Sequence, residues 1–178
     1  MEGLVSLLDE EHSHLTESLW SELESEFGLR GIYITPFPHF SYHVAQGYDK
    51  DELGPILQRV ALRTQVFQIQ ASGLGIFAGT PPVLYIPIVR TRELSELHAT
   101  VWQHTAHTAT SAVDYYRPEG WLPHITLAFG DIHKDNLPDV IHLLSERPLH
   151  WHVTINNLSF IEDTGEEQKV RFRFEFGR

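Results

Sequence analysis

The chain has 178 residues, of which 42% are hydrophobic and 21% charged, as expected for a globular protein with a sizeable core. It contains no cysteine, which excludes disulfides, thiolate metal sites and thiol nucleophiles. The formal net charge is −11, but eight of the 24 acidic residues precede Arg30, the first basic residue. The rest of the chain is therefore nearly balanced and lacks the basic stripe that binding a long nucleic-acid duplex requires.

The sequence contains no apolar run near the ~20 residues that span a bilayer, and its first residues lack the basic start of a signal peptide. We therefore expect no membrane partner and a cytoplasmic location. A small or terminal phosphate suits the charge balance better than a polyanion does.

Residues 3–27 carry apolar side chains at intervals of mostly four, with acidic residues between them. This pattern predicts an amphipathic helix that Gly28 can end. We expect residues 1–28 to form a separate acidic helix and residues 29–178 to form a single bilobal domain. The helix either packs on the body with its acidic face in water or binds a partner.

From residue 31 onward, short β-rich runs alternate with helical stretches. Strands are predicted at 31–35, 39–45, 66–77, 83–89, 122–129, 150–161 and 169–176, and helices at 49–63, 91–110 and 137–146. The Gly-rich phosphate loops of nucleotide-binding folds are absent from the sequence. An α+β architecture follows.

The predicted elements repeat. Each half contains a strand that begins His-x-Ser/Thr, then a helix, then two further strands. The spacing agrees as well, since Leu74 follows His39 by 35 positions and Leu158 follows His124 by 34. We therefore expect two pseudo-symmetric lobes, joined by residues 91–110, around a central cleft.

Both repeated strands place an imidazole and a hydroxyl on one face. Because side chains alternate along a strand, His39, Ser41 and His43 share a face, and so do His124 and Thr126. An imidazole can gain or lose a proton near neutral pH, and a hydroxyl can donate to a phosphoryl oxygen. Two such pairs could cleave a cyclic phosphodiester with no metal and no cofactor, one histidine acting as base and the other as acid.

The two tetrapeptides His-Phe-Ser-Tyr (39–42) and His-Ile-Thr-Leu (124–127) lie 85 positions apart, the second within the run Tyr-Arg-Pro-Glu-Gly-Trp-Leu-Pro-His-Ile-Thr-Leu-Ala (116–128). Here the sequence resembles the 2H phosphoesterases, and among them the 2′-5′ RNA ligase-like (LigT-like) group, over about residues 31–176. The resemblance implies the 2H fold, with His39 and His124 as the catalytic pair and Ser41 and Thr126 as phosphate-binding hydroxyls. It also implies a cyclic phosphodiesterase that acts on a 2′,3′-cyclic phosphate, or a related phosphodiester, of nucleotides or RNA ends.

Three further residues are candidates for substrate binding. His43 either extends the cleft or is structural, Arg117 could contact a phosphate, and Trp121 could stack on a base or belong to the core. The histidine pairs 104/107 and 150/152 lack the three or four ligands of a zinc centre, so no metal site is expected.

Two other functions remain open. A non-catalytic module could use the cleft to recognise a nucleotide or an RNA end. A different 2H reaction could act on 2′-5′ linkages or on ADP-ribose cyclic phosphate. Retention of both histidines and both hydroxyls favours catalysis over binding alone.

Overall fold

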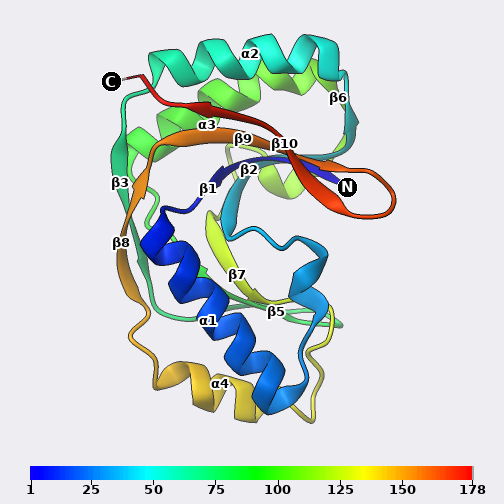
Figure 1. Ribbon diagram of the computed structural model, residues 1–178, viewed down its shortest axis with the longest axis vertical. Coiled ribbons are helices and arrows are strands. Elements are labelled where there is room, and N and C mark those ends of the chain that lie inside the picture. The colour runs from blue at the N-terminus through cyan, green and yellow to red at the C-terminus, as the bar shows by residue number, and fades with distance from the viewer. Residues whose placement is uncertain (178) are drawn as a thin grey trace.

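The computed structural model describes residues 1–177 and confirms an α+β architecture (Figure 1). The helices are α1 (Glu10–Phe27), α2 (Lys50–Arg63), α3 (Arg92–Thr105) and α4 (Leu137–Ser145). The strands are β1 (Glu2–Leu7), β2 (His39–Tyr48), β3 (Phe67–Ser72), β4 (Gly75–Phe77), β5 (Val83–Pro87), β6 (Ala109–Ala112), β7 (His124–Ala128), β8 (His150–Ile155), β9 (Asn157–Asp163) and β10 (Gln168–Glu175). Within residues 1–177, none of the helices combines the length and the apolar character that a membrane crossing requires.

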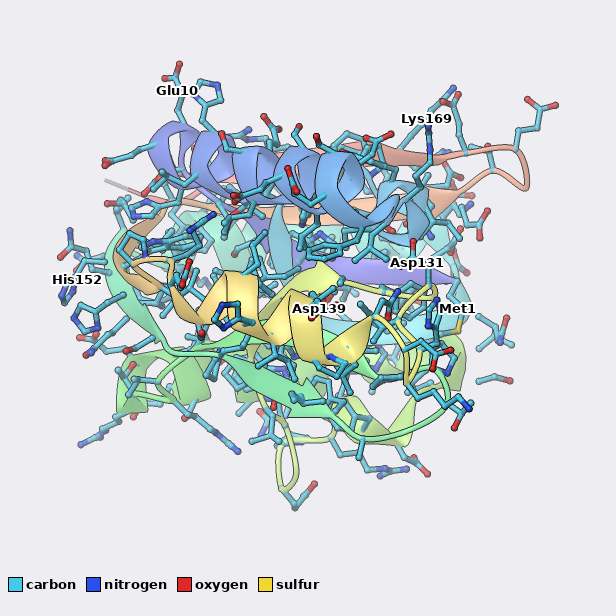
Figure 2. The ribbon with its side chains drawn as sticks, turned by 90° about the horizontal axis from the view of Figure 1, so that it is seen from below. Met1, Glu10, Asp131, Asp139, His152 and Lys169 are labelled. Carbon is cyan, nitrogen blue, oxygen red and sulfur yellow. The ribbon has the colours of Figure 1, made fainter. Side chains whose placement is uncertain are left out.

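The strands form two antiparallel layers. The first layer has the order β10-β9-β1-β2-β6 and is covered by α2 and α3, which lie together at the top of Figure 1. The second layer combines the ladder β4-β5-β7 with the pair β3-β8, and a bridge between Ala71 and Ile88 links the two. Helices α1 and α4 lie at the other end of the molecule, and Figure 2 shows them from below with Glu10 at the start of α1 pointing outward.

The internal repeat is longer than the sequence predicts. The order β1-α1-β2-α2-β3 in the first half matches β5-α3-β7-α4-β8 in the second. Helix α3 is thus the counterpart of α1, so residues 91–110, which were predicted to join the two lobes, also contribute a helix to the second repeat. Each of these helices packs on the histidine strand of the other half, because α1 contacts β7 and α3 contacts β2.

The prediction of one separate helix over residues 3–27 is wrong at its start. Residues 2–7 form β1, which pairs with β2 on one side and β9 on the other, so this segment lies within the body rather than beside it. β1 is short and buried on both faces, and periodicity alone cannot tell the apolar residues of such a strand from one face of a helix. Helix α1 begins only after Asp9, whose side chain accepts a hydrogen bond from the backbone N–H of His12, and it ends at Gly28 with φ +71°.

Other boundaries also differ from the prediction. The expected strand at 31–35 is a short 3₁₀ turn, Gly31–Ile34, where a Cβ on Gly31 would lie 1.8 Å from the carbonyl oxygen of Phe129. The strand at 66–77 divides at Gly73, which adopts φ +88°, and the strand at 150–161 divides into β8 and β9. Helix α3 stops at Thr105, where a threonine-rich run of low helix propensity leads into β6.

Candidate active site

The histidines that begin β2 and β7 are held in the same way. The Nδ1–H of His39 donates to the carbonyl oxygen of Phe37 at 2.5 Å, and the Nδ1–H of His124 donates to that of Leu122 at 2.7 Å. A carbonyl oxygen can only accept, so these bonds assign the proton to Nδ1 in each neutral ring. Both Nε2 atoms are thereby free to accept a proton from a reactant.

The two hydroxyls follow two residues later on the same face as the histidines. Ser41 and Thr126 line one cleft of about 340 Å³ together with His39 and Tyr116, where β2 contacts β7. The intervening residues Phe40, Tyr42, Ile125 and Leu127 are buried in the core. The alternation predicted from the sequence therefore holds for the first three residues of each strand.

Two buried tryptophans fix the backbone beside the hydroxyls. The indole N–H of Trp121 donates to the carbonyl oxygen of Ser41 at 2.9 Å, and the indole N–H of Trp20, on α1, donates to that of Thr126 at 3.1 Å. Both indoles are almost fully buried. An indole thus holds the backbone next to each hydroxyl, although the two tryptophans come from non-equivalent places in the repeat, one on α1 and the other just before β7.

Burial controls the protonation of both motif histidines. Burial lowers the pKa of His39 and outweighs the hydrogen bond to Phe37, which acts to raise it. A positive charge on His124 would lower the pKa of His39 further. Burial also lowers the pKa of His124 and outweighs the hydrogen bond to Leu122, which acts to raise it. A proton on one ring disfavours a proton on the other, so the second proton binds less readily than the first.

His43 does not extend the cleft, so of its two predicted alternatives the structural one is observed. The pairing of β1 with β2 shifts register, with Leu4 opposite His43 but Val5 opposite Ser41, so Tyr42 is an extra residue. Such a bulge reverses the alternation after it. His43 therefore lies in the core, where its Nδ1 and the Tyr48 hydroxyl are 2.5 Å apart and burial lowers its pKa to about 4.

Trp121 and Arg117 also lie away from the cleft. Trp121 is 1% exposed and stacks on His98 with the ring centroids 3.8 Å apart, so a base cannot reach its faces. Arg117 is exposed, donates to Asp114 at 2.8 Å and lies over the ring of Trp102. Of the two alternatives for Trp121, the core position is therefore the observed one, whereas a phosphate contact by Arg117 stays a prediction.

The structure adds two features to the candidate site that the motifs do not contain. Tyr116 lines the cleft together with Ser41, and burial raises the pKa of its phenol. Phe77, Tyr85 and Tyr115 surround His124. Tyr116 could be suspected from its place just before the second motif, whereas nothing in the local sequence connects Phe77 or Tyr85 with His124.

No group of three or more histidine, aspartate or glutamate side chains among residues 1–177 is arranged to hold a metal ion. The Nδ1–H of His104 donates to the carbonyl oxygen of Thr100 within its own helix, and His107 pairs with Glu52. The larger depression of about 610 Å³ between α2 and α3 contains neither motif.

Comparison with solved structures supports the fold. A protein of Thermus thermophilus, TT0787, is 18% identical with a TM-score of 0.67, covering 99% of this chain and 98% of its own. E. coli LigT complexed with 3′-AMP is 14% identical with a TM-score of 0.66, with the same coverage of both chains. A protein described as a phosphoesterase is 12% identical with a TM-score of 0.65 over 99% of this chain and 98% of that one. No curated protein sequence matches the chain.

The family comparison reaches further toward the N-terminus than the predicted resemblance, which began near residue 31. The model of the 2′-5′ RNA ligase superfamily matches residues 10–167, so it includes α1 as well as both histidine strands. This extent agrees with the place of α1 within the repeat. The chain therefore belongs to the 2′-5′ RNA ligase superfamily, and with it to the 2H phosphoesterases.

Proposed function

We propose that this protein hydrolyses 2′,3′-cyclic phosphodiesters of nucleotides or RNA ends by paired acid–base catalysis with His39 and His124. One observation carries the proposal: each imidazole has its Nδ1 occupied by a backbone carbonyl, and each is followed two residues later by a hydroxyl at the same cleft. The superfamily as a whole indicates phosphoester chemistry.

In the proposed reaction, the Nε2 atom of one histidine accepts a proton from water as the water oxygen attacks phosphorus. The bond from phosphorus to a ribose oxygen breaks, and the other histidine, protonated at Nε2, donates a proton to that oxygen. Each of these transfers contributes about 10²–10⁴ in rate. Ser41 and Thr126 donate hydrogen bonds to the non-bridging oxygens, where negative charge accumulates.

The cleft suits a small phosphodiester better than a polyanion. Its volume of about 340 Å³ is that of a small-molecule site, and none of the described residues that line it is Lys or Arg. An imidazolium can then supply positive charge beside the phosphate. Structures of E. coli LigT with 3′-AMP, NADP⁺ and ATP support a nucleotide ligand for this fold.

The proposal is tested by turnover of 2′,3′-cyclic nucleotides in the presence of EDTA. We expect wild-type turnover to survive chelation, because the two imidazoles supply both the acid and the base. His39→Ala and His124→Ala should each lower kcat by at least about 10², and the double variant should lose far less than the product of the two. His142→Ala, which removes an exposed imidazole from α4, serves as the control.

Ser41→Ala and Thr126→Ala should each raise the barrier by about 1–3 kcal/mol, the scale of a hydrogen bond to a charged group. Normal turnover by folded His39→Ala or His124→Ala protein would refute the mechanism, and loss of activity in EDTA that a defined divalent ion restores would refute metal independence. The same assay with 2′-5′ dinucleotides and ADP-ribose 1″,2″-cyclic phosphate separates the proposed substrate from the other 2H reactions.

A further inference from the structure

The cleft face of β7 continues across two more strands. In the antiparallel ladder, Thr126 lies opposite Tyr85 of β5, and Tyr85 lies opposite Gly75 of β4. Residues directly opposite in a ladder project to the same face of the sheet. Tyr85 therefore stands beside Thr126 on the face that carries the second motif, and Phe77, two residues after Gly75, shares this face.

These side chains form an aromatic cluster, defined here as Phe77, Tyr85 and Tyr115. The rings of Phe77 and Tyr85 are stacked with centroids 4.0 Å apart, and Tyr115 meets Phe77 edge-on at 5.3 Å. Phe77 also meets the imidazole of His124 edge-on at 4.8 Å. The aromatic cluster is thus continuous with one of the two motif histidines.

Part of the aromatic cluster is open to solvent. Tyr115 is 38% exposed, and Phe77 and Tyr85 are half-buried. The ring of Tyr85 lies across Gly75, where a Cβ would come within 2.4 Å of it, so a glycine is required at this position. Burial, with the neighbouring Tyr85 and Tyr116, raises the pKa of Tyr115 to about 12, so its phenol stays a neutral hydrogen-bond donor at neutral pH.

The other half of the cleft has a different lining. Val5 lies opposite Ser41, as Tyr85 lies opposite Thr126, and the further wall on that side includes the aliphatic residues Val44 and Ile161. The two half-sites therefore match in their imidazoles and hydroxyls but differ in what surrounds them. The aromatic cluster lies beside His124, whereas aliphatic side chains and the ring of Tyr116 line the cleft with Ser41.

We propose that the aromatic cluster is the nucleobase subsite of the substrate, with the base stacking on the exposed ring of Tyr115 while Phe77 and Tyr85 hold that ring beside His124. This inference rests on the proposed function and extends it, because it commits the substrate to a nucleotide rather than a base-free phosphoester. A flat π surface binds any nucleobase by stacking, so broad base tolerance is expected. The ribose would then lie on the His124 side of the phosphate.

The test is calorimetric binding of 3′-AMP and 2′-AMP compared with ribose phosphate, which needs no turnover. Wild-type protein should bind the nucleotides at least about ten-fold more tightly, the scale of one stacked base. Tyr115→Ala should abolish that difference and leave ribose phosphate binding unchanged, whereas Tyr115→Phe should retain it. Leu62→Ala, at an exposed apolar position on α2, is the control variant.

Three results would overturn the subsite: equal binding of nucleotide and ribose phosphate by the wild type, retention of the nucleotide preference by Tyr115→Ala, or an equal loss for both ligands in that variant. The last would make the cluster a support for His124 only. A failure of the proposed hydrolysis is distinct, since it would appear as absent turnover of cyclic nucleotides while the binding preference and its loss in Tyr115→Ala remain.

Discussion

The lowered pKa values of the two motif histidines determine how the proposed activity depends on pH. Burial favours the neutral form of both rings, yet catalysis requires one neutral and one protonated imidazole. We expect kcat/KM to pass through a maximum below pH ~6.5, the ordinary pKa of histidine. An anionic phosphate in the cleft favours imidazolium, so the maximum in kcat should lie at higher pH. Profiles of both constants across pH 4–9 test this, and a kcat/KM that still rises above pH 8 would contradict it.

His98 links the protonation of a buried histidine to stability. Its Nε2–H donates to the carbonyl oxygens of Tyr42 and Tyr116 at 2.9 and 3.0 Å, and burial lowers its pKa to about 4. The unfolded chain binds the proton more tightly, so this stabilisation is complete above pH ~6.5 and is lost as the pH falls toward 4.

A single substitution isolates that effect. His98→Gln keeps an N–H donor near Nε2 but cannot titrate, so the free energy of unfolding should depend less steeply on pH between 4 and 6.5, by up to about 1.4 kcal/mol per pH unit. Urea unfolding of both proteins at several pH values measures the slope. Parallel curves for wild type and variant would show that His98 is not a source of the acid sensitivity.

Among the elements, β1 gives the clearest contrast between a surface helix and a central strand. Leu4 and Leu15 belong to the same apolar stripe of the helix predicted for residues 3–27, but Leu4 is fully buried in β1 and Leu15 is 41% exposed on α1. Leu4→Ala should lower the free energy of unfolding by about 2–5 kcal/mol and Leu15→Ala by less than about 0.5 kcal/mol. Equal losses would place both residues on one helix face and contradict the sheet order.

The bulge in β2 also matters for function. Tyr42 is the extra residue of the bulge, and its side chain lies in the core, where its hydroxyl is 2.8 Å from that of Ser6. It also turns His43 away from the cleft. β2 therefore presents only the imidazole of His39 to the cleft, so each motif contributes a single imidazole.

Across the molecule as a whole, the aromatic cluster beside His124 predicts unequal acid and base roles for the two motif histidines. If the nucleoside lies on the His124 side, the departing ribose oxygen is next to His124, and water attacks from the side of His39. A cyclic substrate with sulfur in place of the departing oxygen needs little protonation of its leaving group. On this substrate the loss of kcat in His124→Ala should shrink markedly, while the loss in His39→Ala should persist. The opposite pattern of rescue would exchange the two roles.

Local rules were enough to predict the α+β class, the two histidine strands and the shared face of His39 with Ser41 and of His124 with Thr126. Strand alternation needs only three consecutive residues, and two matching motifs in one chain imply a repeat. Gly28 was likewise predicted to end the first helix and does so, whereas the start of α1 at the Asp9 cap was not predicted.

The remaining features depend on contacts between distant segments. β1 is a central strand because β2 and β9, far along the chain, pair with it, and Trp121 is a core residue because Ser41 and His98 meet it there. The aromatic flank of His124 likewise depends on the register of three strands. Each of these contacts joins residues that are far apart in the sequence. Which residues meet depends on the surfaces that the whole fold buries, and the neighbouring residues in the sequence do not determine it.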